Sequence, residues 1–226
     1  MTASADDTAR NDQASPAWLR HLAHDLRSPL SPLQTGVSLL RGGRLGASQQ
    51  TELLDAMQRQ LHVLIQVIDD TGDLIARRNP ALTEMDVGSL LDMVSVRLRA
   101  RFDEAGLQFE VRAPGLPMSL ACDGRDMLRL LGYLALRVGE VHGSGTRVIA
   151  SVQQTQGRID LQLDAASDAD TAKELTALVD RVAQPDPAGV TDAMLHRILH
   201  RHDAELRAAA SGTGLVLSLP APPEAV

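Results

Sequence analysis

Apolar residues recur every three or four positions through the first third of the chain, after a polar start. One stripe runs from Leu19 to Leu40 and a second from Leu54 to Ile75. This spacing places the apolar side chains on one face of a helix, and Ser15-Pro16 is a typical helix start. Two amphipathic helices with a short connection predict an antiparallel hairpin. A lone hairpin would leave much of both stripes in water, so we expect two copies to pair into a four-helix bundle.

The pattern changes after Asn79-Pro80, where helical periodicity mixes with two-residue alternation. We predict helices at 86–104, 125–141, 168–183 and 191–202, and strands at 107–112, 146–153, 158–164, 205–210 and 214–219. This mixture favours a two-layer α+β sandwich. The sequence therefore divides into a disordered tail (1–15), a helical hairpin (16–78), an α+β domain (79–220) and a short tail (221–226).

Composition narrows the class of protein. Aromatic residues make up only 2% of the chain, so its core must be aliphatic, and the net charge of -7 gives no reason to expect nucleic acid or an anionic membrane as partner. Cys122 is the single cysteine, which favours a reducing compartment and a core role. No apolar run approaches the roughly 20 residues that span a bilayer, and no secretory signal is seen. We expect a soluble, cytoplasmic protein without a membrane partner.

The segment with the clearest chemistry is HDLRSPL, residues 24–30. His24 lies off the apolar stripe and should face solvent, where a neutral imidazole can attack a phosphoryl group. Asp25 can hold the ring tautomer or accept its proton. Pro29 lacks an N–H, so it removes a helical hydrogen bond and should bend the helix just past the histidine. An exposed histidine alone would be unremarkable; the whole heptapeptide on the first helix of a hairpin favours function.

The heptapeptide resembles the H-box of two-component sensor histidine kinases, whose first residue is the phosphoacceptor. The similarity continues through most of the chain, covering the family's second phosphotransfer helix (54–78), the entry into its catalytic domain (85–99), the helix that carries the N-box (123–138) and the last strand (215–220). The resemblance implies a phosphotransfer hairpin that forms a homodimer, followed by a sandwich like the histidine kinase ATP-binding domain.

The same resemblance implies roles near His24. The partner would be a response-regulator receiver domain, docked around Arg27 and Pro29. Ser28 stands where the family often places a hydroxyl or amide that orients water for dephosphorylation of the regulator.

The departures from the family lie in the nucleotide site. Tyr133 and Arg137 replace the asparagines that hold magnesium, and a guanidinium has no acceptor atom for a metal. Asp164 stands at the first glycine box and could meet adenine, but the glycines after it are missing. The second box retains Gly189, with Asp192 placing negative charge near the phosphates. We therefore expect no cofactor, and ATP with Mg²⁺ only if this degenerate site still works.

Other candidates are weaker. His196 and His200 are four positions apart, a spacing that can bind Zn²⁺, but no third ligand is evident, so we interpret these residues and His202 as a solvated helix face. Gly212-Thr213-Gly214 lies between predicted strands and reads as a hairpin turn. The acidic pair Asp69-Asp70 is expected to be solvated.

The sequence thus favours a phosphorelay protein that exchanges a phosphoryl group between His24 and an aspartate of a receiver domain, with an upstream histidine kinase as a further candidate partner. One alternative is a non-catalytic pseudokinase scaffold that modulates a regulator or a partner kinase. The other is a divergent ATP-dependent histidine kinase.

Overall fold

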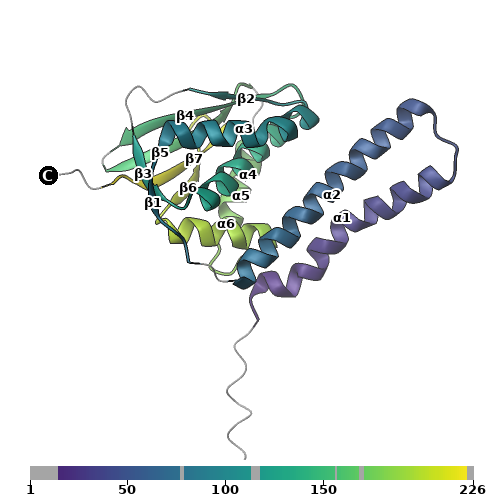
Figure 1. Cartoon of the computed structure of the whole chain (residues 1–226), viewed down its shortest axis with the longest axis horizontal. Helices are drawn as coiled ribbons and strands as arrows, with labels where there is room; N and C mark the ends of the chain where they lie inside the picture. Colours follow the sequence, from purple (N-terminus) through teal and green to yellow (C-terminus); the bar gives the residue numbers. More distant parts are fainter. Residues whose placement is uncertain (1–14, 77–78, 113–117, 156, 168–170, 223–226) are drawn as a thin grey trace, which may run out of the picture. The chain divides into compact units, whose positions relative to one another are not determined.

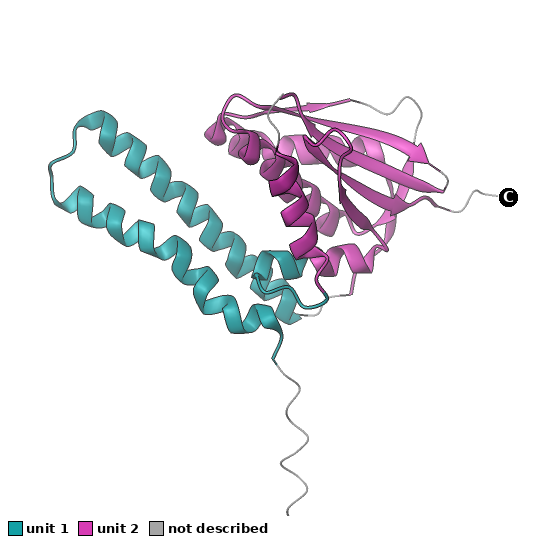
Figure 2. Cartoon of the chain, turned by 180° about the vertical axis from the view of Figure 1, so that it is seen from behind, with its two compact units in different colours: residues 1–76, 185–194 teal, residues 77–184, 195–226 magenta. Residues whose placement is uncertain are grey.

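The computed structural model describes residues 15–76, 79–112, 118–155, 157–167 and 171–222. These residues form two compact units (Figure 2). The first contains the described residues up to Ala76 together with Pro185–Met194, and the second contains the rest. The expectations for residues 1–14, 168–170 and 223–226 fall outside the described part of the chain.

The first unit is built on a helical hairpin, α1 (Ala17–Arg41) and α2 (Ala47–Ala76), as the two apolar stripes predicted (Figure 1). The helices approach closely at Gly36, where an added Cβ would lie 2.6 Å from the Met57 sulfur. Much of the apolar surface of the hairpin still faces outward, and its exposed members include Leu19, Val37, Leu54, Leu61, Ile65, Ile68 and Ile75.

The second unit contains a five-stranded mixed sheet. Its strands are β2 (Gln108–Val111), β4 (Arg147–Thr155), β5 (Arg158–Ala165), β6 (Glu205–Ala208) and β7 (Gly214–Pro220). They lie in the order β2-β4-β5-β7-β6, with β2 and β4 parallel and the other neighbours antiparallel. A separate antiparallel pair joins β1 (Thr83–Asp86) to β3 (Ser119–Cys122).

Helices α3 (Val87–Ala105), α4 (Gly124–His142) and α5 (Ala172–Val182) pack against the sheet as a second layer (Figure 1). A further helix, α6 (Val190–Arg201), follows α5 in the chain and begins in the first unit. The core between the layers is aliphatic, as the composition required; its fully buried members include Leu90, Leu130, Leu134, Leu161 and Leu217. The α+β sandwich was predicted correctly, but β1 and β3 were missed.

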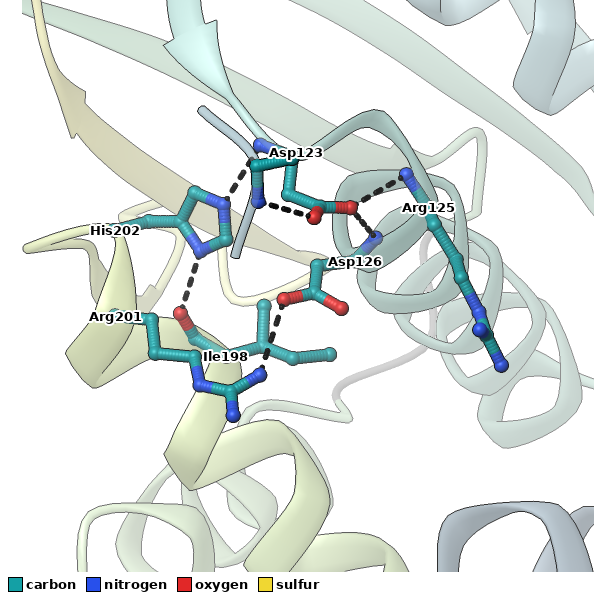
Figure 3. Close-up of polar contacts among 7 residues, drawn as sticks. Asp123, Arg125, Asp126, Ile198, Arg201 and His202 are labelled. Carbon is teal, nitrogen blue, oxygen red and sulfur yellow. Dashed lines mark hydrogen bonds and ion pairs between the residues drawn. The ribbon is translucent and has the colours of Figure 1, made fainter. Parts of the chain in front are cut away.

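A buried polar cluster ties the start of α4 to the end of α6 (Figure 3). The carboxylate of Asp123 caps α4 by accepting the backbone N–H groups of Arg125 and Asp126 at 3.1 and 3.2 Å. Its other oxygen accepts the N–H of Ala81 at 2.9 Å. The Asp123 N–H in turn donates to Nε2 of His202 at 3.1 Å.

The same cluster contains an ion pair, between Arg201 and Asp126 at 3.6 Å. Nδ1 of His202 donates to the Ile198 carbonyl at 2.8 Å. The expectation of a solvated face is therefore wrong for His202, which is 6% exposed.

Among the described residues, no helix is both long enough and apolar enough to span a bilayer.

Candidate functional site

His24 stands on the flank of α1, with its side chain 80% exposed. The prediction that it faces solvent is confirmed. Its Nδ1 lies 3.4 Å from Oδ1 of Asp25, the next residue. A carboxylate can only accept, so this contact favours the proton on Nδ1. The lone pair on Nε2 is then available for nucleophilic attack.

Asp25 has a second contact, which could not be foreseen from the pattern of residues around it. Its Oδ2 accepts the backbone N–H of Val190 at 3.0 Å, within the first unit. Val190 is the first residue of α6, so Asp25 satisfies one of the unpaired N–H groups at that helix start. The carboxylate therefore contacts His24 with one oxygen and Val190 with the other.

The residues that follow differ in accessibility. Arg27 and Ser28 are exposed on the same helix as His24, whereas Pro29 is buried. Pro29 and Pro32 both lie inside α1, which continues through them. A buried ring cannot form part of a docking surface, so the expectation that Pro29 contacts a regulator is revised to a role within the helix.

The expected nucleotide site lacks a suitable set of ligands. Tyr133 and Arg137 lie on α4, both partly buried. The Arg137 guanidinium lies 3.6 Å from the Glu140 carboxylate. A guanidinium cannot ligate Mg²⁺, because it carries only donors.

The Asp164 side chain lies on the face of the sheet opposite to helix α4. Its neighbours Leu163 and Ala165 are buried with Leu161, and side chains alternate between the two faces of a strand. The Asp164 carboxylate accepts from Gln162 and from the Ser211 hydroxyl instead. An adenine bound against α4 would need its partner on the helix-bearing face, so the structure does not bring Asp164 together with Tyr133 and Arg137.

Helix α5 occupies the stretch between the two degenerate glycine boxes. Leu175, Leu178 and Val182 are each no more than 1% exposed, and the helix packs against β6, β7 and α4. The Thr171 hydroxyl at its start lies 2.9 Å from Nε2 of His142. Burying each such apolar side chain contributes about 1.5–3 kcal/mol. This segment is therefore a fixed part of the core, and it lacks the freedom of a lid that closes over a nucleotide.

The second glycine box retains a glycine, but its surroundings serve the hairpin. Gly189 directly precedes α6, and the two residues after it, Val190 and Thr191, both hydrogen-bond to the hairpin helices. Within the described part of the second unit, Arg137 at the position of a metal ligand and Asp164 on the far face of β5 do not fit ATP with Mg²⁺.

Two further expectations can be compared with the structure. Among the described residues, no group of three His, Cys, Asp or Glu side chains is placed to hold a metal ion. His196 and His200 instead line an open cavity of about 480 Å³ between α5, α6 and β6. Cys122 is fully buried, and burial raises the pKa of its thiol to about 11, which confirms a core role.

The expectation for the acidic pair is wrong for one member. Asp69 is exposed, but Asp70 is 0% exposed. Its Oδ1 accepts from Gln66 at 2.7 Å, and its Oδ2 accepts the Thr191 hydroxyl at 2.8 Å.

Comparison with known proteins agrees with this arrangement. Residues 17–76 match the family model described as the His Kinase A (phospho-acceptor) domain. The sensory/regulatory protein RpfC of Xanthomonas campestris pv. campestris is 28% identical over 163 residues, which cover 64% of this chain and 22% of RpfC. The sensor protein CopS of Pseudomonas syringae pv. tomato is 22% identical over 171 residues, covering 74% of this chain and 34% of CopS. The chain thus spans about a fifth to a third of the length of these relatives.

Solved structures show the same fold. The histidine kinase AdeS of Acinetobacter baumannii has a TM-score of 0.57 at 17% identity, covering 88% of this chain and 98% of AdeS. The histidine kinase ThkA, solved in complex with the response regulator protein TrrA, has a TM-score of 0.65 at 12% identity, covering 92% of this chain and 62% of ThkA. Residues 17–76 thus match the phospho-acceptor domain of histidine kinases, and the chain as a whole is similar in fold to solved two-component histidine kinases.

Proposed function

We propose that this chain carries a phosphoryl group on His24 and exchanges it with an aspartate of a response-regulator receiver domain. The observation that carries the proposal is the imidazole of His24, 80% exposed, with Asp25 next to Nδ1. Nε2 attacks the phosphorus of the aspartyl phosphate, the bond from phosphorus to the carboxylate oxygen breaks, and the aspartate leaves with that electron pair. Asp25 stabilises the positive charge that the ring gains.

The degenerate nucleotide site supports a donor other than ATP. Arg137 stands where a metal ligand is needed, Asp164 lies on the far side of the sheet from α4, and α5 is packed as core. A receiver domain that has itself been phosphorylated by an upstream histidine kinase is the donor class that these features favour.

Surface charge supports the same partner class. A phosphoryl group adds roughly -1.5 to -2 charges at neutral pH. Arg27 is exposed three residues after His24 and offers a cation nearby. Ser28 is also exposed, which supports the proposal that its hydroxyl orients water for hydrolysis of the regulator's phosphate.

The exposed apolar side chains of the hairpin support dimerisation. Ile68 and Ile75 are 55% and 65% exposed on α2. Each such side chain gains about 1.5–3 kcal/mol when it is fully buried. Pairing two hairpins into a four-helix bundle would remove these side chains from water.

The second candidate is a non-catalytic scaffold that modulates a regulator or a kinase. The packed α5 helix favours it, because the sandwich then serves as a structural unit. The Asp25 contact to His24 favours phosphotransfer, since a scaffold has no use for an oriented nucleophile.

The experiment compares phosphodonors on the parent, on His24→Ala and on His21→Ala, a control with a second exposed histidine of α1. Label that passes to the parent and to His21→Ala from a phosphorylated receiver domain, but not from labelled ATP, supports the phosphotransferase. Label from ATP would instead identify a divergent kinase. If neither donor labels the protein, the non-catalytic scaffold is the function that remains.

A further inference from the structure

Residues 185–194 form a strap across the base of the hairpin, within the first unit. Three of its residues bond to the two helices. The carboxylate oxygens of Asp186 accept the backbone N–H of Ala17 at 2.9 and 3.0 Å. Val190 donates its N–H to Asp25, and Thr191 donates its hydroxyl to Asp70.

Two of these bonds are reciprocal helix caps. Helix α1 begins after Pro16, whose side chain supplies no cap, and Asp186 provides the missing acceptor. In the opposite direction Asp25, on α1, supplies an acceptor to the first residue of α6. Carboxylates at helix starts satisfy free N–H groups and interact favourably with the helix dipole. The strap and α1 therefore each supply a carboxylate to the helix start of the other.

The third bond is a buried anchor. Asp70 is 0% exposed, and a buried carboxylate is tolerated only where donors surround it. The Thr191 hydroxyl is one of these donors, at 2.8 Å. Val190 next to it is also 0% exposed. The strap is thus fixed where the backbone N–H of Val190 can donate to Asp25.

We propose that the strap positions Asp25 for phosphoryl chemistry at His24, with Thr191 and Asp186 as positioning residues. This inference rests on the proposed function. The Val190 N–H holds Oδ2 of Asp25, which leaves Oδ1 directed at Nδ1 of His24. A carboxylate held in one orientation orients the ring tautomer that frees Nε2. Without the strap, Asp25 gains rotamer freedom and this orientation is lost.

The test uses phosphoramidate, an inorganic donor that needs neither ATP nor a receiver domain. Nε2 of His24 attacks the phosphorus, the P–N bond of phosphoramidate breaks, and ammonia leaves. We expect Thr191→Val and Asp186→Ala each to slow phosphohistidine formation about three- to tenfold, through lost orientation of Asp25. Thr191→Ser, which keeps the hydroxyl, should restore the parent rate. Thr35→Val is the matched control, because Thr35 is exposed on α1 and its hydroxyl donates to the Ser31 carbonyl within its own helix turn.

A double-mutant comparison separates positioning from a merely structural role. If the strap acts through Asp25, then Thr191→Val causes no further slowing in an Asp25→Asn background. An equal slowing in both backgrounds, or no slowing in either, would overturn the proposal.

A second readout does not depend on phosphorylation. Asp25→Ala should speed hydrogen exchange at the Val190 amide at least several-fold. In the control variant Thr35→Val, the Val190 amide should exchange at the same rate as in the parent. Unchanged exchange at Val190 would overturn the strap even if His24 accepts phosphate. Conversely, a parent protein that never forms phosphohistidine would refute the proposed function, while faster exchange would still support the strap contact.

Discussion

The backbone N–H of Asp123 donates to Nε2 of His202 across 79 positions of sequence, at 3.1 Å. Because Nδ1 donates to the Ile198 carbonyl, the imidazole is held as a neutral tautomer that bridges the start of α4 and the end of α6. The ring is part of the structural core of the second unit, although it directly follows a histidine-rich helix whose sequence suggests an exposed surface.

Replacing this ring should destabilise the fold. We expect His202→Ala to lower the free energy of unfolding by about 2 kcal/mol, because a buried N–H loses its acceptor and a small cavity forms. Urea denaturation measures the change. His200→Ala, at an exposed position near the end of α6, should change stability by less than about 0.5 kcal/mol. Equal effects of the two substitutions would contradict the buried bridge.

The residue after His202 has an unusual backbone conformation. Asp203 has a φ of 47°, in the left-handed region, and it follows the end of α6, where the Ala204 N–H bonds to the Leu199 carbonyl. Glycine adopts this conformation without a side-chain penalty. Asp203→Gly should therefore raise stability by up to about 1 kcal/mol, seen as a higher Tm. A lower Tm would show that the Asp203 side chain makes a stabilising contact.

The packing of helix α5 into the core can be tested by substitution. Leu178→Ala should cost about 2–4 kcal/mol, since Leu178 is 0% exposed. Thr176→Ala, at an exposed position of the same helix, serves as the control. If the two variants unfold at the same urea concentration, α5 is not the fixed core helix described above.

Cys122 should be inert in the folded protein. Its thiol is buried, with a pKa raised to about 11, so little thiolate exists at pH 8. Iodoacetamide should therefore leave it unmodified for hours in the native state and alkylate it readily in urea, as followed by mass spectrometry. Rapid native labelling would mean that the core around β3 opens.

Asp86 provides a pH-dependent contribution to stability. Its carboxylate caps α3 by accepting the Ser89 N–H at 2.7 Å, and this hydrogen bond lowers its pKa below 3.8. A group with a lowered pKa stabilises the folded state above its unfolded pKa, and this stabilisation is lost as pH falls through the folded pKa. Asp86→Ala should thus be less stable than the parent at pH 7, and the difference should shrink below about pH 4. Asp92→Ala, exposed on the same helix, is the control for removing a carboxylate away from the helix start.

Much of the fold was predictable, because the strongest signals are periodic. The stripes of the hairpin predicted α1 and α2, and the alternation from Arg158 onward predicted β5. Strands β1 and β3 were missed, although β2 and β6 are equally short and were predicted. The residues TEMD of β1 include a single apolar side chain, Met85, and the partner strand β3 lies far along the chain, so no alternation marks the pair.

The site was predictable only in part. The exposure of His24 followed from its place off the stripe. The burial of Asp70 did not, because its hydroxyl partner Thr191 lies 121 positions further on. The far-side position of Asp164 did have a signal, since Leu161, Leu163 and Ala165 alternate with it and mark the core face.

The strap changes what a fragment of this protein would report. A polypeptide ending at Ala76 would keep His24 and Asp25 but would lack the Val190 amide, 165 positions away from that carboxylate. In this fragment Asp70 would also lose the hydrogen bond from the Thr191 hydroxyl, and the first turn of α1 would lose its cap. Phosphorylation kinetics measured on such a fragment would describe a His24 whose neighbouring carboxylate lacks the hydrogen bond that holds it in the longer chain.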